Sequence, residues 1–186
     1  MIWNIPNLLT VLRIVLIPVF VLVFVSPYSW ANIASTALFG RAALTDWLDG
    51  YLARRLKQLS VFGAFLDPVA DKLMVAVALV LLVQDNPTMI FAVPAAIIVG
   101  REIAISALRE WMSEIGERTK VKVSVIGKVK TTAQMVAILL LLFKSPIGPF
   151  PTHDVGMILI YVAAVLTLWS MIVYMRAAWP VIVGKQ

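Results

Sequence analysis

The sequence predicts an all-α, polytopic membrane protein with six transmembrane helices and an N-terminal interfacial segment. Of its 186 residues, 61% are hydrophobic and 14% are charged, and the mean hydropathy is +0.94. A soluble domain carries roughly a quarter charged residues. The apolar residues also form long continuous runs that do not alternate with polar residues, and this pattern favours helices over a membrane β-barrel.

Six stretches are long enough to cross the hydrocarbon core, which takes about 20 mostly apolar residues in a helix. In chain order they lie at roughly residues 8–25, 32–53, 63–84, 88–109, 127–143 and 155–176. Turn-forming or charged segments separate them near Ser26, from Arg54 to Ser60, near Asp85, from Ser113 to Lys122, and after Lys144. Because no repeat or flexible linker interrupts the chain, we expect a single domain over residues 1–186.

The N-terminal residues form the expected interfacial segment. Trp3, Leu8 and Leu12 could lie along the bilayer surface. The polar residues of the segment would then face elsewhere, and they are Asn4, Asn7, Thr10 and Arg13. This segment is either a membrane anchor or a contact with substrate. No basic residue precedes the first apolar run and no small-residue cleavage site follows it, so we expect a retained segment and not a signal peptide.

Basic residues are distributed unevenly between the two sides that six spans would create. One side holds the termini and the second and fourth loops, with Arg54, Arg55, Arg118 and Lys120 among them, whereas the other side holds Lys144 alone. Positive charge marks the cytoplasmic side of a membrane protein, so we expect both termini to be cytoplasmic. The net charge of +6 then suits anionic lipid, and no basic soluble arm is present to bind nucleic acid.

The chain has no cysteine, which excludes thiolate chemistry.

Four aspartates cluster near the second and third spans. Residues that share one helix face are Asp46, Asp49, Gly50 and Ala53 on the second span, and Gly63, Asp67 and Asp71 on the third. The loop between these spans is short, so the helices should run antiparallel with their acidic faces converging. Carboxylates at membrane depth are energetically costly, and four of one sign cannot all stay ionised without a counter-charge.

Divalent cations are the expected counter-charge. A ligand set made only of oxygen atoms suits Mg²⁺, Mn²⁺ or Ca²⁺, whereas Zn²⁺ is expected with His or Cys. A pair of such ions at a membrane surface would hold phosphate oxygens and stabilise an in-line displacement. Arg54 could add a contact to phosphate, and Asp71 is the best placed of the four to deprotonate an attacking hydroxyl.

Three alternatives compete with metal-assisted chemistry. The aspartates could pair structurally with Arg54, Arg55 or Lys72 at helix ends. They could line a pathway for a divalent cation, although acids are then expected on the far half of the membrane as well. An intramembrane aspartyl protease would use two aspartates that share a proton, which four acids beside an arginine fit poorly.

The aspartate segment also carries a family resemblance. From Asp46 to Asp71 it reads D-x2-D-G-x2-A-R-x8-G-x3-D-x3-D, and it resembles the signature of the CDP-alcohol phosphotransferases at every fixed position. The similarity extends to NIPNLLTVLR, GREIAISALREWM and IGKVKTTAQM, and thus covers essentially the whole chain. It implies a homodimer in the bacterial inner membrane that transfers the phosphatidyl group of CDP-diacylglycerol to glycerol 3-phosphate and releases CMP. Serine and inositol phosphate are acceptors in related enzymes.

The resemblance also implies roles for individual residues. Asp46, Asp49, Asp67 and Asp71 would hold two Mg²⁺ or Mn²⁺ ions, and Asp71 would be the general base. The residues implied at the cytidine diphosphate site are Asn7, Thr10, Asp46, Gly50, Ala53, Arg54 and Gly63.

The acceptor brings a dianionic phosphate and therefore requires cations. The candidates are Arg101 and Arg109 in the fourth span, and Lys128 and Lys130 at the start of the fifth. Arg109 and the two lysines could instead extend their charged ends to the membrane surface. Arg101 could form a buried structural pair with its neighbour Glu102.

Overall fold

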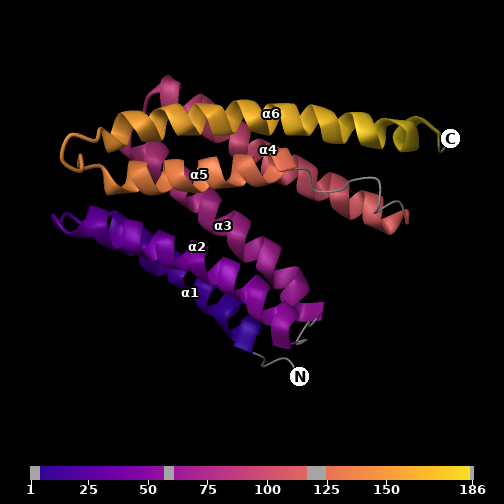
Figure 1. Cartoon of the computed structure of the whole chain (residues 1–186), viewed down its shortest axis with the longest axis horizontal. Coiled ribbons are helices and arrows are strands. Elements are labelled where there is room, and N and C mark those ends of the chain that lie inside the picture. Colours follow the sequence, from indigo (N-terminus) through magenta and orange to yellow (C-terminus); the bar gives the residue numbers. More distant parts are fainter. Residues whose placement is uncertain (1–4, 57–60, 117–124, 185–186) are drawn as a thin grey trace. The chain divides into compact units, whose positions relative to one another are not determined.

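The computed structural model describes residues 5–56, 61–116 and 125–184, without the side chains of residues 5–6, 46–56, 61, 64, 125–126 and 128. Helices make up nearly all of this part of the chain, which confirms the all-α prediction (Figure 1). They are α1 (Ile5–Phe24), α2 (Ala31–Leu56), α3 (Val61–Asp85), α4 (Met89–Glu114), α5 (Val125–Phe143) and α6 (Thr152–Gly184). Each corresponds to one of the six predicted spans.

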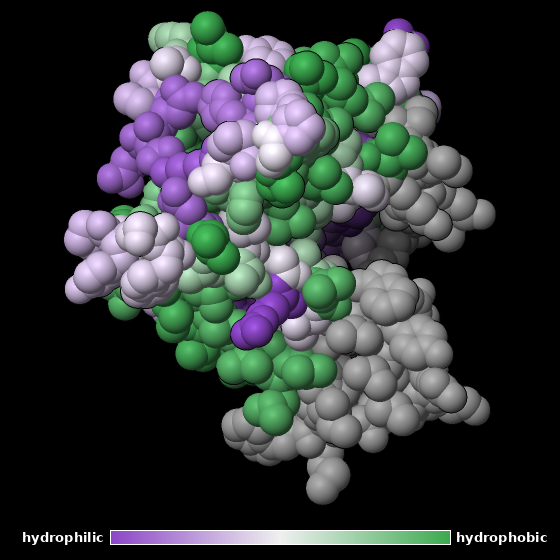
Figure 2. Space-filling view, turned by 60° about the vertical axis from the view of Figure 1, so that its left-hand side comes forward, coloured by the Kyte–Doolittle hydropathy of each residue, from purple (hydrophilic) through white to green (hydrophobic). Residues whose placement is uncertain are grey.

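The helices have the length and composition of membrane spans. Three described segments qualify outright: Asn7–Phe24, Met89–Glu114 and Thr152–Gly184. Val129–Phe143 is apolar but shorter, and α2 and α3 carry the aspartates of the signature. Many large apolar side chains are exposed, and Figure 2 shows green apolar patches among the polar residues of one face, as expected where lipid replaces water as the solvent. The fold is that of a polytopic membrane protein.

The chain forms two compact units, of which the first comprises Met1–Asp85 and Ile138–His153. Within it, α1 packs along both α2 and α3, and these two helices contact each other over a smaller part of their length. Buried Phe20 of α1 meets Phe39 of α2 with ring centroids 6.3 Å apart. The direct contact between α2 and α3 agrees with the prediction that these helices lie side by side, and α1 packs against both of them.

The expected N-terminal interfacial segment continues directly into the first span. From Ile5 to Phe24 the backbone is one uninterrupted helix. Leu8 and Leu12 are about half exposed, while Asn7 and Thr10 are buried. The helix thus presents its apolar residues outward and a polar face to the interior of the first unit, which a surface anchor would not do.

The second unit comprises Asn86–Ala137 and Asp154–Gln186. In it, α4 and α6 run parallel, because contacts follow the same order along both helices. The Tyr161 hydroxyl donates to the Ile90 carbonyl at 2.5 Å, and further along Arg109 donates to the Tyr174 hydroxyl at 2.9 Å. Parallel direction is expected for two spans separated by one other span. The relative direction of α4 and α6 therefore agrees with the alternation of successive spans that the sequence predicted.

Helices α4 and α6 extend beyond the spans predicted from hydropathy, to Glu114 and Gly184. Met112, Ala178 and Val181 form a buried cluster between these extensions, with Leu108 and Ile115 packed against it. Hydropathy alone gave shorter spans, but packing against a neighbour stabilises a helix past the residues that hydropathy marks. Helix α4 ends where Gly116 adopts a φ of +79°, the left-handed conformation that stops helices.

Candidate active site

The structure places the first two aspartates on the C-terminal half of α2. Asp46, Asp49, Gly50, Ala53 and Arg54 all lie within this helix, as the spacing predicted. Their side chains are outside the described part of the structure. The convergence of their face with that of α3 stays a prediction.

Asp67 and Asp71 lie one helical turn apart on α3, and both are half-buried. The Thr10 hydroxyl of α1 donates a hydrogen bond to Oδ1 of Asp67. Gly63, one turn before Asp67, is buried on the same face. This contact connects the N-terminal helix to the acidic face of α3, and a role of Thr10 in substrate binding stays a prediction.

A polar stripe on α1 faces the interior of the first unit. Asn7, Thr10 and Arg13 follow one another at intervals of three residues, and their exposed fractions are 3%, 0% and 2%. The sequence predicted this polar face with Arg13 on it, but it assigned no site role to Arg13. Arg13 thus adds a buried positive charge to the unit that holds Asp67 and Asp71.

The described donor atoms suit a hard cation. Asp67 and Asp71 offer carboxylate oxygens at adjacent turns, and oxygen donors are the ligands that Mg²⁺ and Mn²⁺ prefer. Among the side chains that the structure describes, no group of three or more acidic, His or Cys ligands occurs. Completing the site with Asp46 and Asp49 is therefore an expectation from the sequence.

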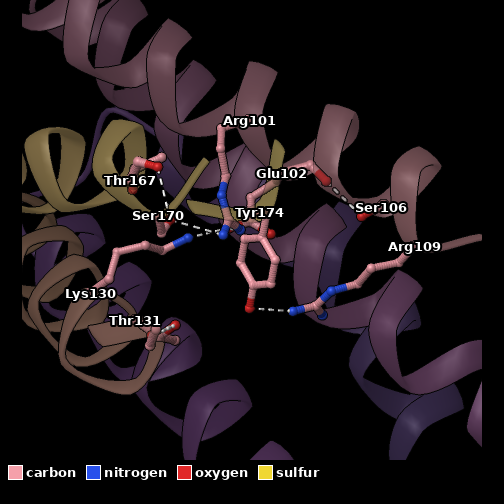
Figure 3. Close-up of polar contacts among 10 residues, drawn as sticks. Arg101, Glu102, Ser106, Arg109, Lys130, Thr131, Thr167, Ser170 and Tyr174 are labelled. Carbon is pink, nitrogen blue, oxygen red and sulfur yellow. Dashed lines mark hydrogen bonds and ion pairs between the residues drawn. The ribbon is translucent and has the colours of Figure 1, made fainter. Parts of the chain in front are cut away.

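A second polar group lies in the second unit, where α4, α5 and α6 each contribute side chains (Figure 3). Glu102 accepts hydrogen bonds from Lys130 at 2.5 Å and from its neighbour Arg101 at 3.2 Å. Arg101 also donates to the Ser170 hydroxyl at 3.0 Å. Arg101 and Lys130 are buried, with exposed fractions of 8% and 3%. The structural pair between Arg101 and Glu102 is confirmed, and Lys130 joins it.

Tyr174 of α6 lies between the two arginines of α4 (Figure 3). Its ring centroid is 5.5 Å from the Arg101 guanidinium carbon and 5.2 Å from that of Arg109. Its hydroxyl accepts a hydrogen bond from Arg109 at 2.9 Å. Three of the four cations predicted for the acceptor phosphate are therefore gathered in one cluster, and the Lys128 side chain lies outside the described part.

Sequence reasoning missed Ser170 and Tyr174. Thr167, Ser170 and Tyr174 are spaced at i, i+3 and i+7 within an otherwise apolar helix. Such a polar stripe marks the face that a membrane helix turns toward its neighbours. All three residues are buried, so the spacing was a valid signal.

Comparison with known proteins identifies the family. A family model described as CDP-alcohol phosphatidyltransferase matches residues 3–169. The chain belongs to the CDP-alcohol phosphatidyltransferase family. The match includes the whole aspartate signature as well as Arg101, Arg109 and Lys130, and it ends just before Ser170 and Tyr174. Family members generally depend on a divalent metal.

Individual members of the family are similar over nearly their full length. A protein of Pseudomonas fluorescens is 56% identical over 178 residues, which cover 95% of this chain and 91% of the relative. A protein of Salmonella paratyphi A is 55% identical over 176 residues, with 95% of each chain covered. A protein of Shigella flexneri serotype 5b is 56% identical with the same coverage. All three are named CDP-diacylglycerol–glycerol-3-phosphate 3-phosphatidyltransferase.

In this CDP-alcohol phosphatidyltransferase, the substitution Glu102→Gln is expected to lower stability by about 3 kcal/mol, because it leaves two buried cations without their carboxylate. Thermal unfolding in detergent, followed by circular dichroism, measures this change. The matched control is Asp85→Asn, which removes the carboxylate of the more exposed pair with Lys144 and should cost less than about 1 kcal/mol. Equal melting temperatures for the two variants would show that the Glu102 carboxylate does not stabilise the protein more than the exposed Asp85 carboxylate does.

Proposed function

We propose that this chain transfers the phosphatidyl group of CDP-diacylglycerol to sn-glycerol 3-phosphate, producing phosphatidylglycerol phosphate and CMP. The observation that carries the proposal is the complete eight-residue signature from Asp46 to Asp71 in a chain of this family. The relatives described above, which are named for this reaction, match 95% of the chain. The protein is thus an enzyme of phospholipid biosynthesis.

In this proposal the first unit binds CDP-diacylglycerol. Asp46, Asp49, Asp67 and Asp71 would hold two Mg²⁺ or Mn²⁺ ions, which would neutralise the charge of the diphosphate. The residues assigned to the cytidine diphosphate are Asn7, Thr10, Asp46, Gly50, Ala53, Arg54 and Gly63. The burial of Asn7 and the hydrogen bond from Thr10 to Asp67 support the part that α1 plays in this assignment.

The proposed reaction is a direct in-line displacement at phosphorus. The primary hydroxyl of glycerol 3-phosphate attacks the β-phosphorus, which bears the diacylglycerol. A new phosphorus–oxygen bond forms to the acceptor while the bond to the phosphate oxygen of CMP breaks. Asp71 accepts the proton of the attacking hydroxyl, as a positioned carboxylate can. No cysteine is present, and no covalent enzyme intermediate is required.

The cations of the second unit are proposed to bind the acceptor phosphate. The residues assigned to this role are Arg101, Arg109, Lys128 and Lys130. Within the described cluster, Arg101, Arg109 and Lys130 carry three positive charges and Glu102 carries one negative charge, which leaves an excess of two. This excess matches a phosphate dianion, and it favours glycerol 3-phosphate over an uncharged or zwitterionic acceptor such as serine.

The same proposal places the protein in the bacterial inner membrane as a homodimer with both termini in the cytoplasm. The uneven distribution of basic residues supports this orientation. We further propose that both compact units belong to one catalytic domain over residues 1–186, since the family match extends from residue 3 to residue 169 and includes parts of both.

Acceptor selectivity tests this function. Purified protein supplied with CDP-diacylglycerol and Mg²⁺ or Mn²⁺ is expected to release CMP when glycerol 3-phosphate is added. The kcat/KM for serine should be lower by about 100-fold or more, because serine lacks the charge-assisted contacts of a phosphate. Inositol phosphate provides a stricter test of acceptor selectivity than serine, because it also carries a phosphate. Equal CMP release with serine or inositol phosphate would reject glycerol 3-phosphate as the specific acceptor.

A further inference from the structure

We infer that Tyr174 is a positioning residue for recognition of the acceptor phosphate, acting by holding the guanidinium groups of Arg101 and Arg109. The inference rests on the proposed function, since it deepens the role of that cluster. Tyr174 itself was not among the residues that the sequence suggested.

The geometry of Tyr174 differs from that of an ordinary packing residue. Arg101 and Arg109 are eight residues apart on α4, about 12 Å along the helix axis. One buried ring contacts both of them, with centroid distances of 5.5 Å and 5.2 Å. The hydroxyl of the same side chain fixes a nitrogen of Arg109 at 2.9 Å. A single side chain on α6 thereby sets the positions of two cations on α4 (Figure 3).

The two arginines differ in how many donors remain for a ligand. Arg101 already donates to Glu102 and to Ser170, and it is buried, so a dissolved anion has little access to its remaining donors. Among the described residues, Tyr174 is the sole partner of the Arg109 guanidinium. A guanidinium has five N–H donors, and Arg109 uses one of them here. Arg109 is also exposed, so its remaining donors are accessible to a dissolved anion.

An aromatic partner holds such a cation without neutralising it. A carboxylate would fix Arg109 equally well but would cancel the charge that attracts a phosphate. A tyrosine ring instead stabilises the guanidinium through its quadrupole and leaves the full positive charge available. Ordering a long arginine side chain before the ligand arrives also reduces the entropy lost on binding. Tyr174 therefore prepares Arg109 for a phosphate, while Glu102 and Ser170 secure Arg101.

Two substitutions at Tyr174 separate the ring from the hydroxyl. Tyr174→Leu removes both, and we expect KM for glycerol 3-phosphate to rise by about tenfold, the combined effect of two cation–π contacts and one hydrogen bond. Tyr174→Phe keeps the ring, so the rise should be about threefold or less. In both variants KM for CDP-diacylglycerol should stay within about twofold of the wild-type value, which reports on correct folding.

The matched control lies on the same helix. Tyr161 also forms a hydrogen bond with α4, here by donating to the Ile90 carbonyl, but it contacts no arginine in the described part of the chain. Tyr161→Leu should leave KM for both substrates unchanged. If Tyr174→Leu raises the two KM values equally, or leaves KM for glycerol 3-phosphate unchanged, Tyr174 has no positioning role.

A binding measurement separates this inference from the proposed function. Isothermal titration of the detergent-solubilised protein with inorganic phosphate and with glycerol 3-phosphate gives the affinity without turnover. If the wild-type protein binds phosphate about tenfold more tightly than Tyr174→Leu, the positioning role holds even if CMP release fails to depend on glycerol 3-phosphate. If CMP release does depend on glycerol 3-phosphate but both proteins bind equally, the function stands and the role of Tyr174 is rejected.

Discussion

Removal of divalent cations is expected to abolish phosphatidyl transfer, with a loss of about 10³-fold or more in CMP release. The physical reason is charge. Four aspartates and a diphosphate would otherwise repel one another at the membrane surface, where carboxylates are already costly to keep ionised. The measurement is CMP release from CDP-diacylglycerol after treatment with excess EDTA, followed by addition of Mg²⁺ or Mn²⁺.

Restoration of activity by either ion would support the hard-cation site, and Zn²⁺ should restore it poorly because the ligands are oxygen atoms. Two substitutions on α3 test whether the metal dependence comes from the signature aspartates. Asp67→Asn should raise the concentration of metal needed for half-maximal activity, whereas Asp85→Asn, which lies at the other end of the same helix beside Lys144, should not. Full activity in excess chelator would exclude the metal site altogether.

The sequence was sufficient for the helices because lipid imposes a simple rule. Every backbone group must be satisfied within a helix, so a long apolar run and a membrane helix coincide. The boundaries were less predictable where packing extends a helix beyond the span predicted from hydropathy. The cluster of Met112, Ala178 and Val181 prolongs α4 and α6 in this way, and it joins residues far apart in the chain.

In the candidate site, too, some features could be predicted from the sequence and others depend on how the helices pack. The aspartates could be predicted because their spacing alone assigns them to helix faces, and a run of acids in a bilayer requires an explanation. The partners of those residues could not be predicted with equal ease. The contact of Thr10 with Asp67 depends on α1 packing against α3, and the contact of Tyr174 with Arg109 depends on α6 lying parallel to α4. Both depend on which helices become neighbours, which hydropathy does not determine.

The catalytic role of the aspartate segment is tested most directly by the substitution Asp71→Asn. Asparagine has nearly the same shape but cannot accept the proton of the attacking hydroxyl, so kcat should fall by about 10³-fold. Binding of CDP-diacylglycerol should remain within about threefold of wild type, because most of the proposed contacts to the cytidine diphosphate lie elsewhere. Asp85→Asn again serves as the control on the same helix.

The decisive measurement is therefore a pair of numbers for Asp71→Asn: single-turnover CMP release in the presence of glycerol 3-phosphate, and the dissociation constant for CDP-diacylglycerol. Lost turnover with retained binding is the predicted result. Turnover close to that of the wild-type protein would contradict the assignment of Asp71 as the base.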